Sequence, residues 1–459
     1  MMRLNEAAQA CGGELAGNDC EFTAVGTDTR ADLTGALYIA LRGERFDGNA
    51  FVKEAAAAGA VAALVDKRET VVAPDGFPLI RVDDTRLALG TLSQHWRRKF
   101  DIPVIGVTGS NGKTTVKEMC AAILSAWART QGLNPAMAVL ATQGNLNNDI
   151  GLPQMLLRLR DTHKAAVFEM GMNHPGEIAY LANLAEPTVA VVNNAQRAHL
   201  EGMGEVFSVA QEKGQIYGAL DESGVAIVNV DDAHAAYWRD LNVERRVITF
   251  GLSVDADVSA AHSMLAFGSS VTLSAFGEKR DFLLSVPGQH NVRNAAAAAA
   301  AALAAGISLD VVVQGLAGYN GTKGRLQVRR TAEGAVVLDD TYNANPDSVR
   351  AGIDVLAATP GGKVLVLGDM GEIGDISAQC HDEVGGYAKS QGIDRLLALG
   401  EHSAVAVRNF GSGGEHFENV DDLVSALRAM LAPDMVVLVK GSRFMKMERV
   451  VQAIAESEK

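Results

Sequence analysis

The residues at 106–115, GVTGSNGKTT, lie between an apolar run that predicts a buried strand and a segment that predicts a helix. Glycines let successive backbone N–H groups turn inward around phosphate oxygens, and the helix N-terminus adds partial positive charge. Lys113 would reach the terminal phosphates of a nucleotide, and the hydroxyl of Thr114 would bind Mg²⁺. The predicted ATP-binding loop comprises Gly109, Ser110, Asn111, Gly112, Lys113, Thr114 and Thr115.

This loop departs from the strict phosphate-loop pattern GxxxxGK[ST], because Val107 stands where the leading glycine is expected and Gly106 sits one residue earlier. An ordinary glycine turn is the alternative interpretation, and the strand before it and the helix after it favour the phosphate loop. Kinases, motors and ligases share such loops. The loop alone therefore does not define what the nucleotide is used for.

Three further residues could complete a metal site, and each also has an ordinary interpretation. Glu169 ends the strand-like run AAVFE, where a carboxylate beside a phosphate loop could bind Mg²⁺, although acidic residues at strand ends are often only solvated. His199, in NNAQRAHLEGMG, could complete a metal shell or could be a surface histidine. Lys213 lies on a predicted helix, where a solvated lysine is the ordinary expectation.

Three segments further along the chain could contact the nucleotide. Asn291, in HNVRN, precedes an alanine-rich run and would either cap that helix or contact the nucleotide. Arg325 follows a glycine-rich break, where its guanidinium would reach a phosphate when domains close or would cap a loop. The segment DDTYNANPDS, at 339–348, has the composition of a turn. Spacing alone does not decide between these alternatives.

Short runs rich in Val, Ile and Leu alternate with helix-like segments, a pattern that predicts parallel sheets covered by helices and an α/β fold. Ligands of open parallel sheets gather at the carboxyl ends of the strands, where these runs end in polar or glycine residues. Besides the strand before the loop, strands are predicted at 37–41, 61–65, 78–82, 165–171, 188–194, 224–230, 246–251, 335–340, 363–369, 395–400 and 435–441. Helices are predicted at 87–100 and at 294–305, the second of which Gly306 would end.

The length of 459 residues predicts three domains, at about 100–200 residues each. We expect a small α/β domain at 1–84, a central ATPase-like domain with a parallel sheet at 85–318, and a Rossmann-like domain at 319–459. The segment GYNGTKGR, at 318–325, breaks the periodicity with three glycines and predicts the hinge between the second and third domains.

Composition excludes several classes of protein. A net charge of -14 disfavours nucleic acid as the main partner. The longest apolar stretch, at 295–305, falls well short of the ~20 residues that cross a bilayer. The N-terminus lacks the basic stretch and apolar core of a signal peptide, so we expect a cytoplasmic protein. The four cysteines are scattered and fit neither a zinc site nor a disulfide framework.

Taken together, these segments resemble the Mur ligase family, ATP-dependent enzymes that add amino acids or peptides to the nucleotide precursor of bacterial peptidoglycan. The family's loop reads GxTGxNGKT, one residue longer than the strict pattern, and the loop here matches it. The resemblance runs almost end to end, through TDTR (27–30), LRGERFDGNAF (41–51), GNLNNDIGLP (144–153), EMGMNHPGEI (169–178), NNAQRAHLEGMG (193–204), DDTYNANPDS (339–348), GDMGEIG (368–374) and KGSR (440–443). Two positions depart from the family, because Asn49 replaces a usual histidine and Met203 replaces a common aromatic residue.

The resemblance implies a ligase with the small-molecule substrates UDP-N-acetylmuramoyl-tripeptide and D-alanyl-D-alanine. We expect a monomer, although the sequence carries no signal of oligomeric state. It implies that the N-terminal domain holds the uridine end through Thr27, Arg30, Gly43, Phe46 and Asp47. Asn147 and Asn148 would face the sugar-peptide substrate. ATP would also contact Asn291, Arg325, Asp340 and Asn345, the last three arriving when the C-terminal domain closes.

The resemblance also implies metal ligands and catalytic residues. Two Mg²⁺ ions would be held by Thr114, Glu169, His199 and Lys213. Lys213 matches a lysine that is carbamylated in related members, a modification that turns a cation into a metal-binding carboxylate. Lys113, His199 and Lys213 are the implied catalytic residues.

An amine cannot expel oxide from a carboxylate, but it can expel phosphate from an acyl phosphate, and ATP would supply that phosphate. Lys113, Arg325 and the metal ions would provide the cations that bring a carboxylate against the γ-phosphate. Three alternatives remain open from the sequence: a sister ligase with the same loop and hinge, a phosphotransferase, and an interaction module that binds ATP without chemistry.

Overall fold

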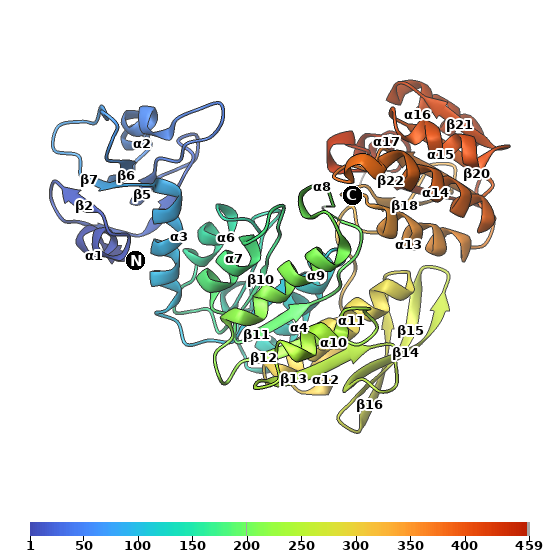
Figure 1. Ribbon diagram of the computed structural model, residues 1–459, viewed down its shortest axis with the longest axis horizontal. Coiled ribbons are helices and arrows are strands. Elements are labelled where there is room, and N and C mark those ends of the chain that lie inside the picture. Colours follow the sequence, from blue (N-terminus) through green and yellow to red (C-terminus); the bar gives the residue numbers. More distant parts are fainter. Residues whose placement is uncertain (199, 457–459) are drawn as a thin grey trace.

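The computed structural model describes residues 1–198 and 200–456, which form three α/β domains with separate sheets (Figure 1). The N-terminal and C-terminal domains flank the central domain. All the strands predicted from the sequence are confirmed, with ends that shift by one or two residues at most places. Among the described residues, no helix is both long and apolar enough to cross a membrane.

The N-terminal domain has a five-stranded sheet of order β2-β7-β6-β5-β4, in which β2 is antiparallel and the other strands are parallel. Its strands are β2 (Glu14–Ala16), β4 (Ala24–Gly26), β5 (Ala36–Ile39), β6 (Ala62–Asp66) and β7 (Leu79–Val82), beside a small pair of β1 (Met2–Arg3) and β3 (Glu21–Phe22). Its helices are α1 (Leu4–Ala10), η1 (Gly48–Phe51) and α2 (Val52–Ala57), and α3 (Thr85–Arg97) leads into the central domain.

The central domain has a nine-stranded sheet of order β16-β15-β14-β13-β12-β11-β8-β10-β9. The parallel strands are β8 (Val104–Thr108), β9 (Val139–Ala141), β10 (Ala165–Glu169), β11 (Val189–Val192), β12 (Val225–Asn229) and β13 (Arg246–Gly251). Beyond them β14 (Val258–Leu265) pairs in parallel with β13, whereas β15 (Gly268–Ala275) and β16 (Glu278–Leu284) are antiparallel, an extension that the sequence analysis did not predict. The phosphate-loop strand β8 thus lies between β11 and β10, inside the sheet.

Helices cover both faces of the central sheet. They are α4 (Lys113–Thr130), α5 (Pro135–Ala138), α6 (Gly151–Leu156), α7 (Glu177–Ala185), α8 (Leu200–Met203), α9 (Val206–Gly214), η2 (Gln215–Ala219), α10 (Ala235–Asp240), α11 (Gln289–Ala304) and α12 (Leu309–Ala317). The alanine helix is confirmed as α11, and its alanines at 295–302 are fully buried against the sheet and α4. Small side chains let the helix lie close to the strands, and Gly306, at φ 84°, follows its end.

The C-terminal domain has a six-stranded sheet of order β17-β18-β22-β19-β20-β21, parallel except for β17. Its strands are β17 (Gln327–Arg330), β18 (Val336–Asp340), β19 (Gly362–Gly368), β20 (Arg395–Leu399), β21 (Gly414–Phe417) and β22 (Met435–Lys440). Its helices are α13 (Pro346–Ala357), η3 (Gly374–Ile376), α14 (Ser377–Ser390), α15 (Ser403–Phe410), α16 (Val420–Met430), η4 (Arg443–Met445) and α17 (Glu448–Ile454).

The central and C-terminal domains touch at more than one place. The segment at 318–325 joins α12 to β17, so the chain crosses between the domains where the hinge is predicted. Far from it in sequence, Phe267 at the turn between β14 and β15 packs against the hydrophobic core of the C-terminal domain. Arg197, from the central domain, donates through Nε (3.0 Å) and Nη2 (2.8 Å) to Asp347 on α13.

Candidate active site

The predicted phosphate loop turns tightly between β8 and α4. Gly109 has φ 154° and Gly112 has φ 79°, and both conformations favour glycine. A Cβ atom on Gly112 would lie 2.4 Å from Oδ1 of Asn294 and 2.5 Å from Nδ2 of Asn193. The glycine at 112 is therefore required both by the backbone turn and by the side chains packed beneath the loop.

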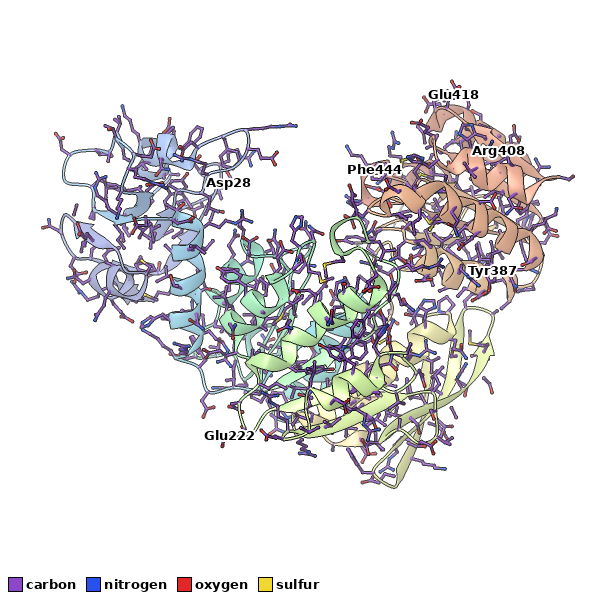
Figure 2. All side chains as sticks on the ribbon, viewed as in Figure 1. Asp28, Glu222, Tyr387, Arg408, Glu418 and Phe444 are labelled. Carbon is purple, nitrogen blue, oxygen red and sulfur yellow. The ribbon has the colours of Figure 1, made fainter. Side chains whose placement is uncertain are left out.

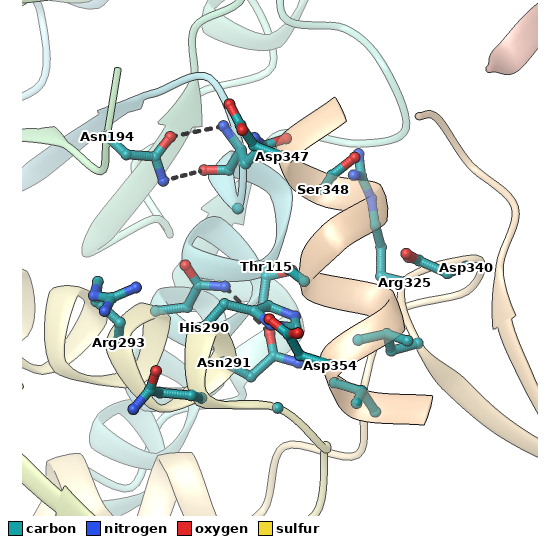
Figure 3. Close-up of a pocket in the computed structure, with 18 of the residues that line it drawn as sticks. Thr115, Asn194, His290, Asn291, Arg293, Arg325, Asp340, Asp347, Ser348 and Asp354 are labelled. Carbon is teal, nitrogen blue, oxygen red and sulfur yellow. Dashed lines mark hydrogen bonds between the residues drawn. The ribbon is translucent and has the colours of Figure 1, made fainter. Parts of the chain in front are cut away.

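Asparagines from neighbouring elements hold the loop in place. Nδ2 of Asn193 donates to the backbone oxygen of Asn111 (2.9 Å) and to Oδ1 of Asn294 on α11 (2.9 Å). Asn194 accepts from the backbone N–H of Asn111 (2.8 Å) and returns a bond to its oxygen (3.0 Å), as the dashed lines of Figure 3 show. These hydrogen bonds thus fix the shape of the loop, and the side of the loop away from the asparagines faces the cavities.

Lys113, at the first position of α4, is half-buried and folds back over the loop. Its Nζ donates to the backbone oxygens of Gly109 (2.7 Å) and Ser110 (3.3 Å). Burial lowers the pKa of Lys113, and the nearby cation Arg325 lowers it further, whereas Glu169 raises it. An arriving phosphate would offer this ammonium a better partner than the neutral carbonyls do.

Glu169 ends β10 and is almost fully buried. Its Oε1 accepts from Nδ2 of Asn147 (2.7 Å), and its backbone N–H donates to Oγ1 of Thr142 (2.9 Å). Its Oε2 is buried without a hydrogen-bond partner among the described residues. An unpartnered buried carboxylate oxygen beside a phosphate loop fits the role of a cation ligand. His199, the imidazole that is expected to bind metal together with Glu169, lies outside the described residues.

Lys213 lies near the end of α9, and its Nζ is fully buried. Within the described part of the chain this nitrogen has no hydrogen-bond partner. Burial holds the pKa of Lys213 well below its usual range, and the neighbouring cation Lys113 lowers it further. The carboxylate of the adjacent Glu212 is already engaged by the backbone N–H groups of Gly176 and Ile178 (2.9 Å each). Lys213 is therefore a buried amine with a lowered pKa and no hydrogen-bond partner among the described residues, unlike a solvated surface lysine.

A cavity of about 380 Å³ lies between the central and C-terminal domains beside the loop (Figure 3). Asn291 and His290 of α11 line one side, and Asp347, Ser348 and Asp354 of α13 line the other. The predicted nucleotide residues Asn111, Gly112, Thr115, Asn291, Arg325 and Asp340 all line this cavity. Asn291 does not cap α11, whose cap residue is Gly288; its Nδ2 donates to the oxygen of Pro287 (2.7 Å), and its Oδ1 accepts from Nδ2 of Asn294 (3.2 Å).

Three of the predicted nucleotide residues come from the C-terminal domain. Nη2 of Arg325 lies 3.4 Å from Oγ1 of Thr114, and its guanidinium stacks over the ring of Tyr342 with its carbon 4.2 Å from the ring centroid. Asn345 caps α13 by accepting from the backbone N–H of Ser348 (2.9 Å), so it has a structural role in its segment, and its contact with the nucleotide stays a prediction. Asp340, at the end of β18, pairs with buried Lys440 (2.6 Å).

A second cavity, of about 600 Å³, adjoins the other side of the loop. Asn147, Asn148, Glu169, Lys113 and Thr114 line it from the central domain. Asn345, Tyr342 and Arg443 line it from the C-terminal domain, and Arg86 lines it from α3. Asn111, Gly112, Arg325 and Ser348 line both cavities. The two cavities therefore meet at the phosphate loop.

The residues expected to hold the uridine end do not line either cavity. Thr27 and Arg30 follow β4, while Gly43, Phe46 and Asp47 follow β5, so all five stand at the carboxyl ends of adjacent parallel strands. The neighbouring Asp28 lies on the side of the N-terminal domain that faces Phe444 of the C-terminal domain (Figure 2).

Asn49, where the family usually has histidine, is buried and has a structural task. Its Nδ2 donates to Oδ1 of Asp47 (2.7 Å), and its Oδ1 accepts from the backbone N–H of Asp66 (3.0 Å). The asparagine thus ties the loop after β5 to the end of β6.

Several residues of the site were not singled out from the sequence. Asn193 and Asn194 end a predicted strand, and Asn294 lies one helical turn after Asn291, so strand ends and helix spacing were available signals. Lys440 was quoted only within KGSR, and its pairing with Asp340 depends on the neighbourhood of β18 and β22.

Comparison with known proteins agrees with this geometry. Family models match residues 21–97 (Mur ligase family, catalytic domain), 107–302 (Mur ligase middle domain) and 324–443 (Mur ligase, glutamate ligase domain). The chain belongs to the Mur ligase family.

Among the curated relatives, the UDP-N-acetylmuramoyl-tripeptide–D-alanyl-D-alanine ligase of Escherichia coli is 43% identical, over 99% of this chain and 98% of that protein. The ligase of the same name from Bacillus subtilis is 36% identical, over 99% and 98%. A crystal structure of MurF from Acinetobacter baumannii has a TM-score of 0.89 at 36% identity, covering 98% of this chain and 97% of that one. MurF from Thermotoga maritima in complex with ADP has a TM-score of 0.83 at 27% identity, covering 94% and 96%.

Proposed function

We propose that this protein is an ATP-dependent ligase that joins D-alanyl-D-alanine to the terminal carboxylate of UDP-N-acetylmuramoyl-tripeptide in peptidoglycan precursor synthesis. One observation carries the proposal. The cavities of about 380 Å³ and about 600 Å³ meet at the same phosphate loop, so a carboxylate bound in the second can reach a phosphate bound in the first. Full-length relatives at up to 43% identity bear the name of this ligase.

The reaction would proceed in two steps. The tripeptide carboxylate attacks the γ-phosphorus of ATP, and ADP leaves, giving an acyl phosphate. The amine of D-alanyl-D-alanine then attacks the acyl carbon, the C–O bond to phosphate breaks, and the amine loses its extra proton. Lys113 and Arg325 would balance the negative charge that gathers when the carboxylate approaches the phosphates. The C-terminal domain would shield the acyl phosphate from water.

The residues present fit Mg²⁺. Among the described residues, no cluster of three or more His, Cys, Asp or Glu side chains forms a ready-made metal site. Mg²⁺ in nucleotide sites is commonly held by one or two carboxylates together with phosphates and waters, so a cluster is not required. Glu169 with its unpartnered Oε2, the hydroxyl of Thr114 and His199 would hold the ions, which would neutralise phosphate charge.

We propose that Lys213 is carbamylated. A neutral amine adds to carbon dioxide, forming an N–C bond and releasing a proton, and burial favours the neutral amine. The product is a carboxylate on a long arm, which would bind a second Mg²⁺. The lack of any partner for Nζ among the described residues supports this assignment.

The uridine end would bind to the N-terminal domain through Thr27, Arg30, Gly43, Phe46 and Asp47. We propose a monomer as the working unit. ATP and nucleotide-linked peptides are intracellular compounds, which supports a cytoplasmic location.

The decisive test follows phosphate release from ATP with each substrate alone and with both together. Sustained release and the pentapeptide product only with both substrates are expected. Equal turnover with other amines would indicate a sister ligase, and phosphate retained on the acceptor would indicate a phosphotransferase. ATP binding without turnover would indicate an interaction module. Oxygen label placed in the tripeptide carboxylate should appear in the released phosphate.

A further inference from the structure

Arg86 and Asp149 form an ion pair at the edge of the 600 Å³ cavity. Arg86 lies in the first turn of α3, and Asp149 directly follows Asn148 in the loop before α6. Nε of Arg86 donates to Oδ2 of Asp149. Among the described residues, Nη1 and Nη2 of Arg86 and Oδ1 of Asp149 have no hydrogen-bond partner, and the Arg86 side chain is 55% exposed. The pair therefore has unused donors and an unused acceptor.

The other charged groups of this cavity already have places in the proposed reaction or the fold. Lys113, Arg325 and Glu169 belong to the phosphate and metal side. In the C-terminal domain, Arg443 donates through Nη1 to Glu448 (3.0 Å), and the backbone oxygen of Glu372 accepts from the N–H of Glu201 (3.4 Å). One carboxylate oxygen of Glu177 is used by the backbone N–H groups of Asn173 (2.6 Å) and His174 (3.1 Å). The ion pair of Arg86 and Asp149 thus lies beside the expected sugar-peptide residues Asn147 and Asn148 and has no other role in the proposed reaction.

This position matters because of which carboxylate reacts. In the proposed function, the carboxylate that meets the γ-phosphate belongs to the third residue of the tripeptide. The side chain of that same residue must then lie within a few ångströms of the phosphate loop, in this cavity. A side chain that ends in an ammonium and a carboxylate on one carbon would match the pair, with the carboxylate on the guanidinium and the ammonium on Asp149.

We infer that Arg86 and Asp149 select the third residue of the tripeptide and favour a side chain with a zwitterionic end over one with an ammonium end alone. The inference rests on the proposed function. 2,6-Diaminopimelate has such an end, and lysine differs from it by lacking the distal carboxylate. With lysine, Asp149 would still meet the ammonium, but the guanidinium of Arg86 would lose its partner.

The first experiment needs no variant. It compares kcat/KM of the whole enzyme for three tripeptide substrates, which carry diaminopimelate, diaminopimelate with its distal carboxylate as an amide, or lysine as the third residue. We expect the first to exceed the other two by about 10- to 100-fold, the value of a charge-assisted hydrogen-bond pair. Equal values for the three would overturn the inference and leave the ligase intact. Absence of turnover with all three would instead overturn the proposed function.

The second experiment removes the guanidinium. Arg86→Met should lower kcat/KM for the diaminopimelate substrate to about the lysine value, while the lysine substrate changes by less than about threefold. Arg98→Met is the matched control, because Arg98 directly follows α3 and pairs with Glu186 (2.6 Å) but lines neither cavity. It should retain the preference. Equal losses for both substrates in Arg86→Met would show that the pair only fastens α3 to the loop, and would refute the inference.

Discussion

The side-chain amides of Asn111 and Asn345 bond to each other across the boundary between the central and C-terminal domains. Nδ2 of Asn345 donates to Oδ1 of Asn111 (2.8 Å), and Nδ2 of Asn111 lies 3.3 Å from Oδ1 of Asn345. The same Oδ1 of Asn345 caps α13. One side chain therefore fixes the start of a helix and joins it to the phosphate loop.

These two tasks can be separated by mutation. Asn345→Asp keeps an acceptor for the cap but loses the donor to Asn111, so we expect the KM for ATP to rise by about threefold or more with little change in thermal stability. Asn345→Ala loses both the cap and the bond to Asn111, and it should also lower the free energy of unfolding by about 1 kcal/mol. Asn419→Ala is the control, because Asn419 caps α16 (2.9 Å to the N–H of Asp422) away from the site. An unchanged KM in both Asn345 variants would contradict the role of the amide pair.

Gly112→Ala should impair nucleotide binding. The new Cβ would lie 2.4 Å from Oδ1 of Asn294 on a backbone with φ 79°, so the loop must shift. Strain of this kind costs on the order of 1–3 kcal/mol, and we expect ATP affinity, measured by calorimetry, to fall by about tenfold or more. Gly218→Ala should have no effect, because nothing lies within 4 Å of its Cβ position. Normal ATP binding by Gly112→Ala would show that the loop conformation is different in solution.

Lys213→Ala should lose most of its turnover if the buried amine carries a carbamate. A short carboxylic acid added to the buffer should restore part of that turnover, because it would supply the missing carboxylate in the space left by the side chain. Removing carbon dioxide and bicarbonate should slow the unaltered enzyme. The measurement is the rate of phosphate release with both substrates, and full activity of the variant without the acid would refute the carbamate.

His290, in the nucleotide cavity, should make the protein less stable in acid. Burial lowers the pKa of His290 from 6.5 to about 4 in the folded protein. As the pH falls from about 6.5 to 4, the unfolded chain takes up a proton that the folded chain does not, so stability present above pH 6.5 is lost. His290→Gln should therefore show a shallower fall of the melting temperature over this window without nucleotide. Parallel curves for the two proteins would contradict the lowered pKa.

Much of the fold could be predicted from local sequence because parallel strands buried on both faces are continuous apolar runs. The strands around the phosphate loop were of this kind, whereas helix α11 was predicted from its alanine run and the loop from its glycines. The strands from 258 to 284 were missed because one face of the hairpins is exposed, as in the exposed end of β14.

The candidate site was predictable only where one segment contains the chemistry. The loop at 109–115 is such a segment, and its residues 110–115 line the two cavities. The asparagines that hold the loop could not be predicted. Asn193 and Asn294 are 101 residues apart in the sequence, and their contact depends on how β11 and α11 are placed. Lys213 was undecided for the same reason, since burial of one lysine on a helix of mixed polarity is set by the elements around it.

Phe267 gives the C-terminal domain a second point of support besides the segment at 318–325. If the polar contacts Arg197–Asp347 and Asn111–Asn345 open while these two attachments hold, the domain can turn only about the line that joins the two attachments. The domain would then open and close by rotation about one axis, which returns the same side chains to the phosphate loop after each product leaves.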